Sequence, residues 1–116
     1  MIFAIMAMVA LAGCYYDLGE ELRTSNECPP DSISFTAQVL PILDVQCNSC
    51  HSAQAAFGGV VLDAYDSVLV YVNDGSLLGS IKHEGGFSPM PPDQSKIPEC
   101  EIQQLTIWVN EGSINN

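Results

Sequence analysis

Apolar residues recur at helical spacing over the last two thirds of the chain, and the first such stretch follows Ser34, a suitable N-cap residue. Its apolar side chains run from Phe35 to Val45. Pro41 lacks a backbone donor, so the stretch is either a kinked helix or an extended entry followed by a helix with Pro41 in its first turn. Both alternatives place Cys47 at the C-terminal end of a helix.

Two short helices are predicted in the middle of the chain. The first carries apolar residues between positions 65 and 72, with Asp63 as its cap and the turn residues 73–75 at its end. The second runs from Leu77 to His83, with Ser76 as its cap.

The last predicted helix follows a loop over residues 84–92, where glycine and proline exclude regular structure. Pro98 suits a first-turn position, and Glu99 and Glu101 favour the positive N-terminal end of a helix. Gly112 ends the helix, whose apolar stripe consists of Ile102, Leu105, Ile107, Trp108 and Val109. Because no alternating strand pattern is present, the sequence predicts a small all-α domain of about four helices.

The N-terminal residues 1–13 carry no charge and end in small residues, as the apolar part of a signal peptide does. They are too few to span a bilayer. The run Leu11-Ala12-Gly13-Cys14 resembles the lipobox of bacterial lipoproteins, which implies cleavage before Cys14 and lipidation of that cysteine. An ordinary signal peptide and an uncleaved anchor are the alternatives. The lack of Lys or Arg ahead of the apolar run counts against a standard signal peptide.

The rest of the chain divides into an acidic flexible tether, residues 14–33, and a domain, residues 34–116. The sequence has 14 acidic and 3 basic side chains, and the net charge of -11 falls entirely after the predicted signal peptide. This charge argues against nucleic acid and anionic headgroups as partners. Membrane attachment would therefore come from acyl chains on Cys14, in the cell envelope, on the periplasmic side or on the outer membrane surface.

The run Cys47-Asn48-Ser49-Cys50-His51 is the pattern required for covalent attachment of a c-type haem. Two thiols two residues apart reach the two vinyl groups, while the adjacent imidazole reaches the iron. With five cysteines and two histidines in 116 residues, a chance match is expected on the order of a few times in a thousand. We therefore predict one haem c on Cys47 and Cys50, with His51 as an iron ligand.

Two other functions would use the same residues. A thioredoxin-like dithiol requires a βαβ pattern around the motif, which the sequence lacks. A zinc site would combine the motif with His83 and with Cys28 or Cys100, but the chain has no second closely spaced ligand pair.

Met90 is the candidate for the sixth position of the iron. It lies between Pro89 and Pro91, where a rigid loop can hold a thioether against the metal, and a neutral thioether favours the ferrous state. A methionine that fills a gap in the core is the alternative interpretation. His83 is the rival ligand and would give bis-His ligation.

The remaining cysteines after Cys14 are Cys28, just before the domain, and Cys100, in the first turn of the last helix. In an oxidising compartment they are predicted to form a disulfide that joins the start of the domain to that helix. Two free thiols are the alternative.

Several motifs taken together resemble those of small class I c-type cytochromes over about residues 35–116. They are Cys-x-x-Cys-His, Gly58-Gly59, Ser88-Pro89-Met90-Pro91-Pro92 and Ile107-Trp108-Val109-Asn110-Glu111-Gly112. Within this class the chain is most similar to single-haem lipoprotein domains of Bacteroidetes and neighbouring bacteria.

The resemblance implies thioether bonds at Cys47 and Cys50 and axial ligation by His51 and Met90. It also implies that the last helix, with Trp108, packs across the first. Better-known members carry lysines around the haem edge that this sequence lacks, so an electrostatically steered partner should present a basic face.

These expectations combine into a membrane-tethered, monomeric single-electron carrier that exchanges electrons with a donor protein and an acceptor protein. A haem-based gas-binding or sensing module, in which Met90 leaves the iron, is the alternative. An enzyme is not expected, because the chain has no spare catalytic histidine or acid constellation.

Overall fold

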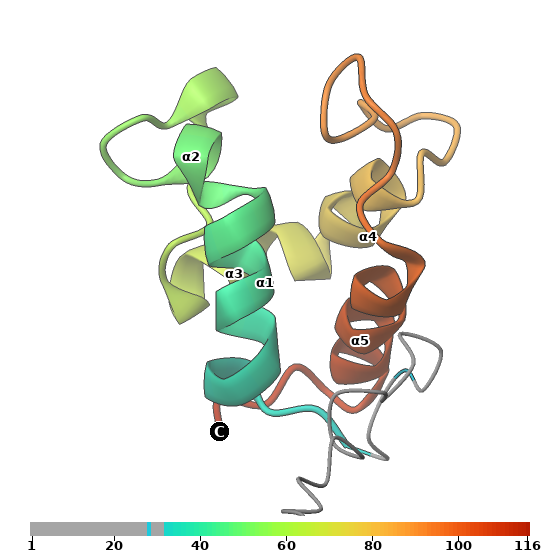
Figure 1. Ribbon diagram of the computed structural model, residues 1–116. Coiled ribbons are helices and arrows are strands. Elements are labelled where there is room, and N and C mark those ends of the chain that lie inside the picture. The colour runs from blue at the N-terminus through green and yellow to red at the C-terminus, as the bar shows by residue number, and fades with distance from the viewer. Residues whose placement is uncertain (1–27, 29–31) are drawn as a thin grey trace, which may run out of the picture.

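The computed structural model describes residue 28 and residues 32–116. The predicted signal peptide, the lipidation site at Cys14 and nearly all of the tether lie outside the described residues. Within them the chain is all-α, as predicted, and has no strand. No described helix is long and apolar enough to cross a membrane. The elements are η2 (Phe35–Val39), α1 (Leu40–Gln46), α2 (Asn48–His51), η3 (Phe57–Gly59), α3 (Tyr65–Asn73), α4 (Ser76–Ile81) and α5 (Glu99–Asn110) (Figure 1).

The first helical stretch begins at Ser34, as predicted, where the side-chain oxygen accepts a hydrogen bond from the N–H of Ala37 at 3.3 Å. The turn that follows, η2, is π-helical, and in it the N–H of Val39 donates to the carbonyl of Ser34 at 3.2 Å. It continues directly into α1, with Pro41 in the first turn of α1, where a missing N–H costs little. The chain is thus helical on both sides of Pro41, and an extended entry is wrong.

The core lies where α5 packs along the helix formed by η2 and α1. Trp108 is fully buried, and its ring centroid lies 5.5 Å from that of Phe35. The Phe35 ring also meets Tyr65 of α3 edge to face at 5.1 Å. The indole N–H of Trp108 donates to the carbonyl of Ile114 at 3.0 Å, so its polar atom is satisfied. The buried apolar residues are Ile33, Phe35, Val39, Ile42, Leu43, Leu62, Val68, Leu77, Ile81, Ile97, Ile102, Leu105 and Trp108.

Two predicted caps are wrong. Asp63 does not cap α3, because its carboxylate accepts a hydrogen bond from the N–H of Ala53 at 2.7 Å, and α3 begins without a side-chain cap. Ser76 is the first residue of α4 and not its cap. Asp74 takes the capping role there: its carboxylate accepts from the side chain and from the N–H of Ser76, and these bonds lower the pKa of Asp74.

Two helix ends also differ from the prediction. The helix α4 ends at Ile81, so His83 lies beyond it, and α5 begins at Glu99, one residue after Pro98. The acidic first turn of α5, with Glu99 and Glu101, is as predicted.

The structure places the sulfur atoms of Cys28 and Cys100 1.98 Å apart, which is disulfide distance, in the pairing that the sequence predicts. The two residues are 72 positions apart in the sequence. The bond connects the residue ahead of the domain to the first turn of α5.

Replacing both Cys28 and Cys100 by serine should lower the free energy of unfolding by up to roughly 4 kcal/mol, because the cross-link restricts the unfolded chain. Urea unfolding followed by the fluorescence of Trp108 measures the loss. Reductant should destabilise the unaltered protein to the same extent and leave the double variant unchanged. Equal midpoints for the double variant and the unaltered protein would contradict the prediction.

Candidate functional site

The Cys-x-x-Cys-His run forms one helical turn directly after α1. The N–H groups of Cys50 and His51 both donate to the carbonyl of Cys47, at 3.1 and 3.0 Å. Residues three and four positions apart share one face of a helix, so the two thiols and the imidazole are presented to the same side. All three residues are half-buried.

The loop after the motif, residues 52–63, is hydrogen-bonded to the end of the motif turn. The N–H of Leu62, a buried core residue, donates to the carbonyl of His51 at 2.7 Å. The bond from the N–H of Ala53 to Asp63 closes the same loop, which turns at Gly58–Gly59, where both residues have the positive φ that favours glycine. The backbone of His51 is therefore held in place by the core.

The imidazole of His51 has no protein partner among the described residues. Its Nδ1 atom is buried and unpaired. Leaving a buried polar atom unpaired costs free energy, so such a ring is suited to a partner that is not a protein atom. A metal ion is one such partner for a neutral imidazole. The oxygen Oδ1 of Asn48, in the same turn, is likewise buried and unpaired, so iron ligation by His51 stays a prediction.

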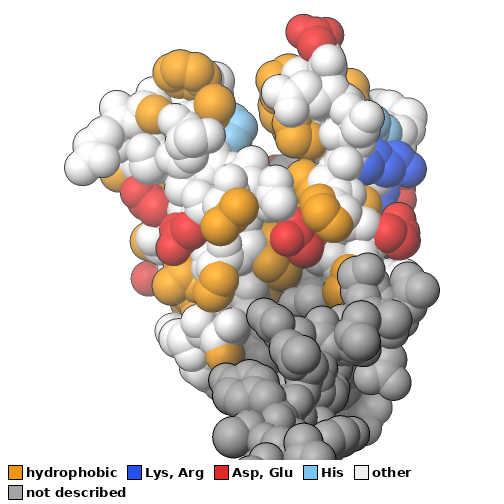
Figure 2. All heavy atoms as spheres, in the orientation of Figure 1, with side chains coloured by type: hydrophobic (Ala, Val, Ile, Leu, Met, Phe, Trp, Pro, Cys, Tyr) orange, Lys and Arg blue, Asp and Glu red, His pale blue; other side chains and the backbone are white. Residues whose placement is uncertain are grey.

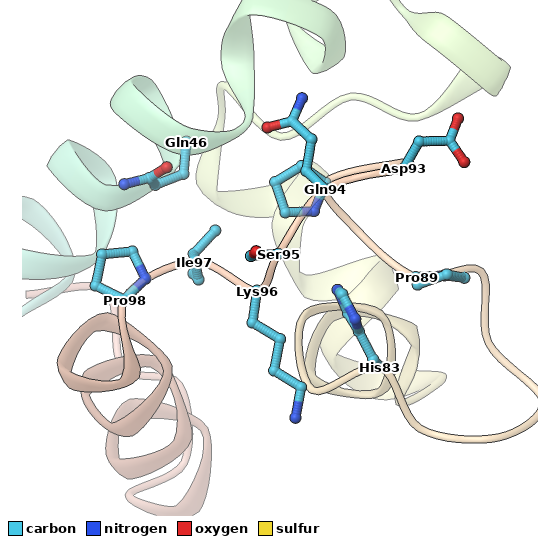
Figure 3. A pocket seen from close by; sticks show the side chains of 10 residues that line it. Gln46, His83, Pro89, Asp93, Gln94, Ser95, Lys96, Ile97 and Pro98 are labelled. Carbon is cyan, nitrogen blue, oxygen red and sulfur yellow. The ribbon is translucent and has the colours of Figure 1, made fainter.

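A cavity of about 910 Å³ lies between the end of α1 and the segment that connects α4 to α5. Figure 2 shows the corresponding hollow in the molecular surface. Its volume falls in the range of about 300–1,000 Å³ that is typical of ligand and cofactor pockets. The lining residues are Gln46, His83, Pro89, Pro91, Asp93, Gln94, Ser95, Lys96, Ile97 and Pro98, and Figure 3 shows their side chains.

Of the predicted site residues only His83, the rival iron ligand, lines this cavity, and Cys47, Cys50, His51 and Met90 do not. Gln46 of the lining directly precedes Cys47, and Pro89 and Pro91 directly flank Met90. The motif turn and the Met90 loop are therefore each adjacent in sequence to residues that line the cavity.

The Cys47 thiol lies in an apolar and negatively charged setting. Burial, and secondarily the Glu101 carboxylate, raise the pKa of Cys47 to about 11, so the thiol is protonated at neutral pH. The Glu101 carboxylate accepts a hydrogen bond from the amide of Gln46 at 2.8 Å, which joins α5 to the end of α1. Among the described cysteines, Cys47 and Cys50 form no disulfide.

Met90 is bound through its backbone to the end of α4. Its N–H donates to the carbonyl of Ser80 at 3.0 Å, and its carbonyl lies 3.0 Å from Nε2 of His83, the donor of that bond. His83, the alternative candidate for the sixth ligand, is therefore hydrogen-bonded to the backbone of Met90. The Met90 side chain is half-buried.

The loop that carries Met90 is also held by an aromatic ring. A β-carbon at Gly79 of α4 would lie 2.3 to 2.5 Å from three atoms of the Phe87 ring, so the ring packs directly on the helix backbone. Only glycine permits so close an approach. The loop is therefore attached to α4 at Gly79, Ser80 and His83.

The sequence did not predict the contact between Glu101 and Gln46. It also did not predict the contact between His83 and Met90. The packing of the last helix across the first is the signal that could have placed Glu101 near the motif. No local pattern indicates the role of His83.

The described residues contain no group of three or more His, Cys, Asp or Glu side chains that could hold a metal ion, which is what the zinc alternative requires. We found no match to this chain among protein-family models, among curated proteins or among solved structures.

Replacing Gly79 by alanine should destabilise the protein by about 1 kcal/mol, because displacing the Phe87 ring outweighs the gain in helix propensity. Thermal unfolding measures the change. Gly85→Ala is the matched control: a β-carbon there would have no neighbour within 4 Å, so the variant should be neutral. If the two variants have the same melting temperature, Phe87 does not hold the loop on α4.

Proposed function

We propose that this protein is a single-electron carrier of the class I cytochrome c type, with one haem c attached to Cys47 and Cys50. The observation that carries the proposal is the motif turn, which presents two thiols and an unpaired imidazole on one helix face beside a cavity of cofactor size. Met90, between two prolines that line that cavity, is the proposed sixth ligand. The packing of Trp108 on Phe35 agrees with the helix arrangement of this family.

When bound, the haem would supply a one-electron couple between ferric and ferrous iron. The residues of this chain would hold the two proposed iron ligands on fixed backbone: His51 through Leu62 of the core, and Met90 through Ser80 and through His83 just after α4. Fixed ligands keep the structural change between the two oxidation states small. As an iron ligand, the neutral thioether of Met90 would favour the ferrous state.

Covalent haem is tested by expressing the full chain in a bacterium that attaches haem c to exported proteins. The purified protein should be red and give a pyridine haemochrome spectrum with thioether features. Replacing Cys47 and Cys50 by alanine should abolish covalent attachment, whereas Ser49→Ala, between them, should retain it. A colourless protein that contains zinc would overturn the proposal.

A gas-binding or sensing module is the second candidate, because the cavity is open and Met90 is only half-buried. The two functions differ in the reduced protein. An electron carrier with Met90 on the iron binds carbon monoxide slowly, and a sensor with a displaceable Met90 binds it rapidly.

We also propose that the domain is tethered to the cell envelope by lipid on Cys14. The lipobox-like run carries this proposal, and the acidic segment behind it would separate the domain from the membrane. Because the net charge is -11, the electron donor and acceptor should approach with basic surfaces.

Mass spectrometry of the membrane fraction should find acyl chains on Cys14 and no residue before it. Cys14→Ser should release the protein from the membrane, while Tyr15→Ala, at the next position, should leave it attached. An intact Met1 in the membrane fraction would contradict lipidation.

A further inference from the structure

The helix α4 ends in a hydrogen-bond pattern that usually contains glycine. The N–H of Glu84 donates to the carbonyl of Gly79 at 2.9 Å, and the N–H of His83 donates to that of Ser80 at 3.2 Å. This pair of bonds is the Schellman motif, in which the residue after the C-cap is left-handed. That residue is His83, with a φ of 56°.

The same pattern at the end of α5 uses glycine. The N–H of Ser113 donates to the carbonyl of Trp108 at 2.9 Å, and the N–H of Gly112 donates to that of Val109 at 3.1 Å. Gly112 has a φ of 97°. A side chain at such a position costs free energy that glycine avoids, and a favourable contact of the His83 side chain would offset that cost.

The side chain of His83 makes such a contact. Its Nε2–H donates to the carbonyl of Met90 at 3.0 Å, while the N–H of Met90 donates to Ser80 at 3.0 Å. Both backbone polar groups of Met90 are thus bonded to a single turn at the end of α4. Figure 3 shows His83 at that helix end, on the wall of the cavity.

We infer that His83 is a positioning residue, whose imidazole fixes the peptide of Met90 and thereby keeps the thioether on the iron. The inference rests on the proposed function and deepens it. His83 acts through Met90 and does not itself bind iron. Without the imidazole, the carbonyl of Met90 loses its partner and its peptide is held at one end only.

Carbon monoxide binding to the reduced haem protein tests this inference, because carbon monoxide binds only where the thioether has left the iron. In His83→Gly the imidazole is absent and the left-handed backbone is favoured. Loss of one hydrogen bond should increase the fraction of protein with Met90 dissociated, and hence the binding rate, by about threefold to tenfold. The weak near-infrared thioether band of the oxidised protein should decrease in parallel.

Three further variants complete the comparison. His83→Gln places an amide donor at a similar reach and should restore most of the slow binding. Glu84→Gln, at the exposed neighbouring position, should behave like the unaltered protein. Met90→Ala sets the rate for complete loss of the thioether.

Wild-type rates and an intact band in His83→Gly would overturn the inference, because a purely structural residue at this position is replaced by glycine without loss. Nitrogen-15 NMR of the reduced, unaltered protein provides a second test. His83 should carry a proton on Nε2, since a carbonyl only accepts, and a neutral ring protonated on Nδ1 would also overturn it. If the unaltered protein carries no haem bound covalently to Cys47 and Cys50, the proposed function is refuted instead.

Discussion

The contact between the buried rings of Trp108 and Phe35 determines where both sides of the cavity lie. Phe35 is near the start of the first helical stretch and Trp108 is near the end of α5, so the two helices run in opposite directions. At their other ends, Gln46 bonds to Glu101 beside the motif. Packing of two apolar rings at one end of the two helices therefore brings Gln46 and Glu101 together beside Cys47 at the other end. A slip of one helical turn would move Glu101 away from Cys47.

Much of the fold was predictable because it depends on local chemistry. The Ser34 cap, the helical spacing of apolar residues and the acidic first turn of α5 each stabilise a helix through neighbours in sequence. The caps at Asp63 and Ser76 were wrong because a carboxylate or hydroxyl has several backbone donors within reach, and the choice depends on tertiary contacts. Asp63 binds Ala53, ten residues away, once the loop has folded back.

Part of the candidate site was likewise predictable from local sequence, and part depends on tertiary contacts. The spacing of Cys47, Cys50 and His51 fixes one helical turn, so their common face is contained in the sequence. The attachment of Met90 is not, because it depends on the left-handed backbone of His83, which no local pattern in the sequence predicts at that position. The glycine at position 79 is likewise explained only by the ring of Phe87 above it. Such contacts join segments whose distance in space no periodicity describes.

The pKa of Cys47 has a consequence for the order in which the sulfur atoms react. Thiolate, and not thiol, attacks disulfides, and a group with a pKa of about 11 is ionised in about one molecule in ten thousand at pH 7. In the folded chain, Cys47 is therefore a slow nucleophile toward the Cys28–Cys100 bond. Once that bond has closed, scrambling is suppressed by the same burial that shapes the motif. Burial of the Cys47 thiol thus protects the cross-link between the start of the domain and α5.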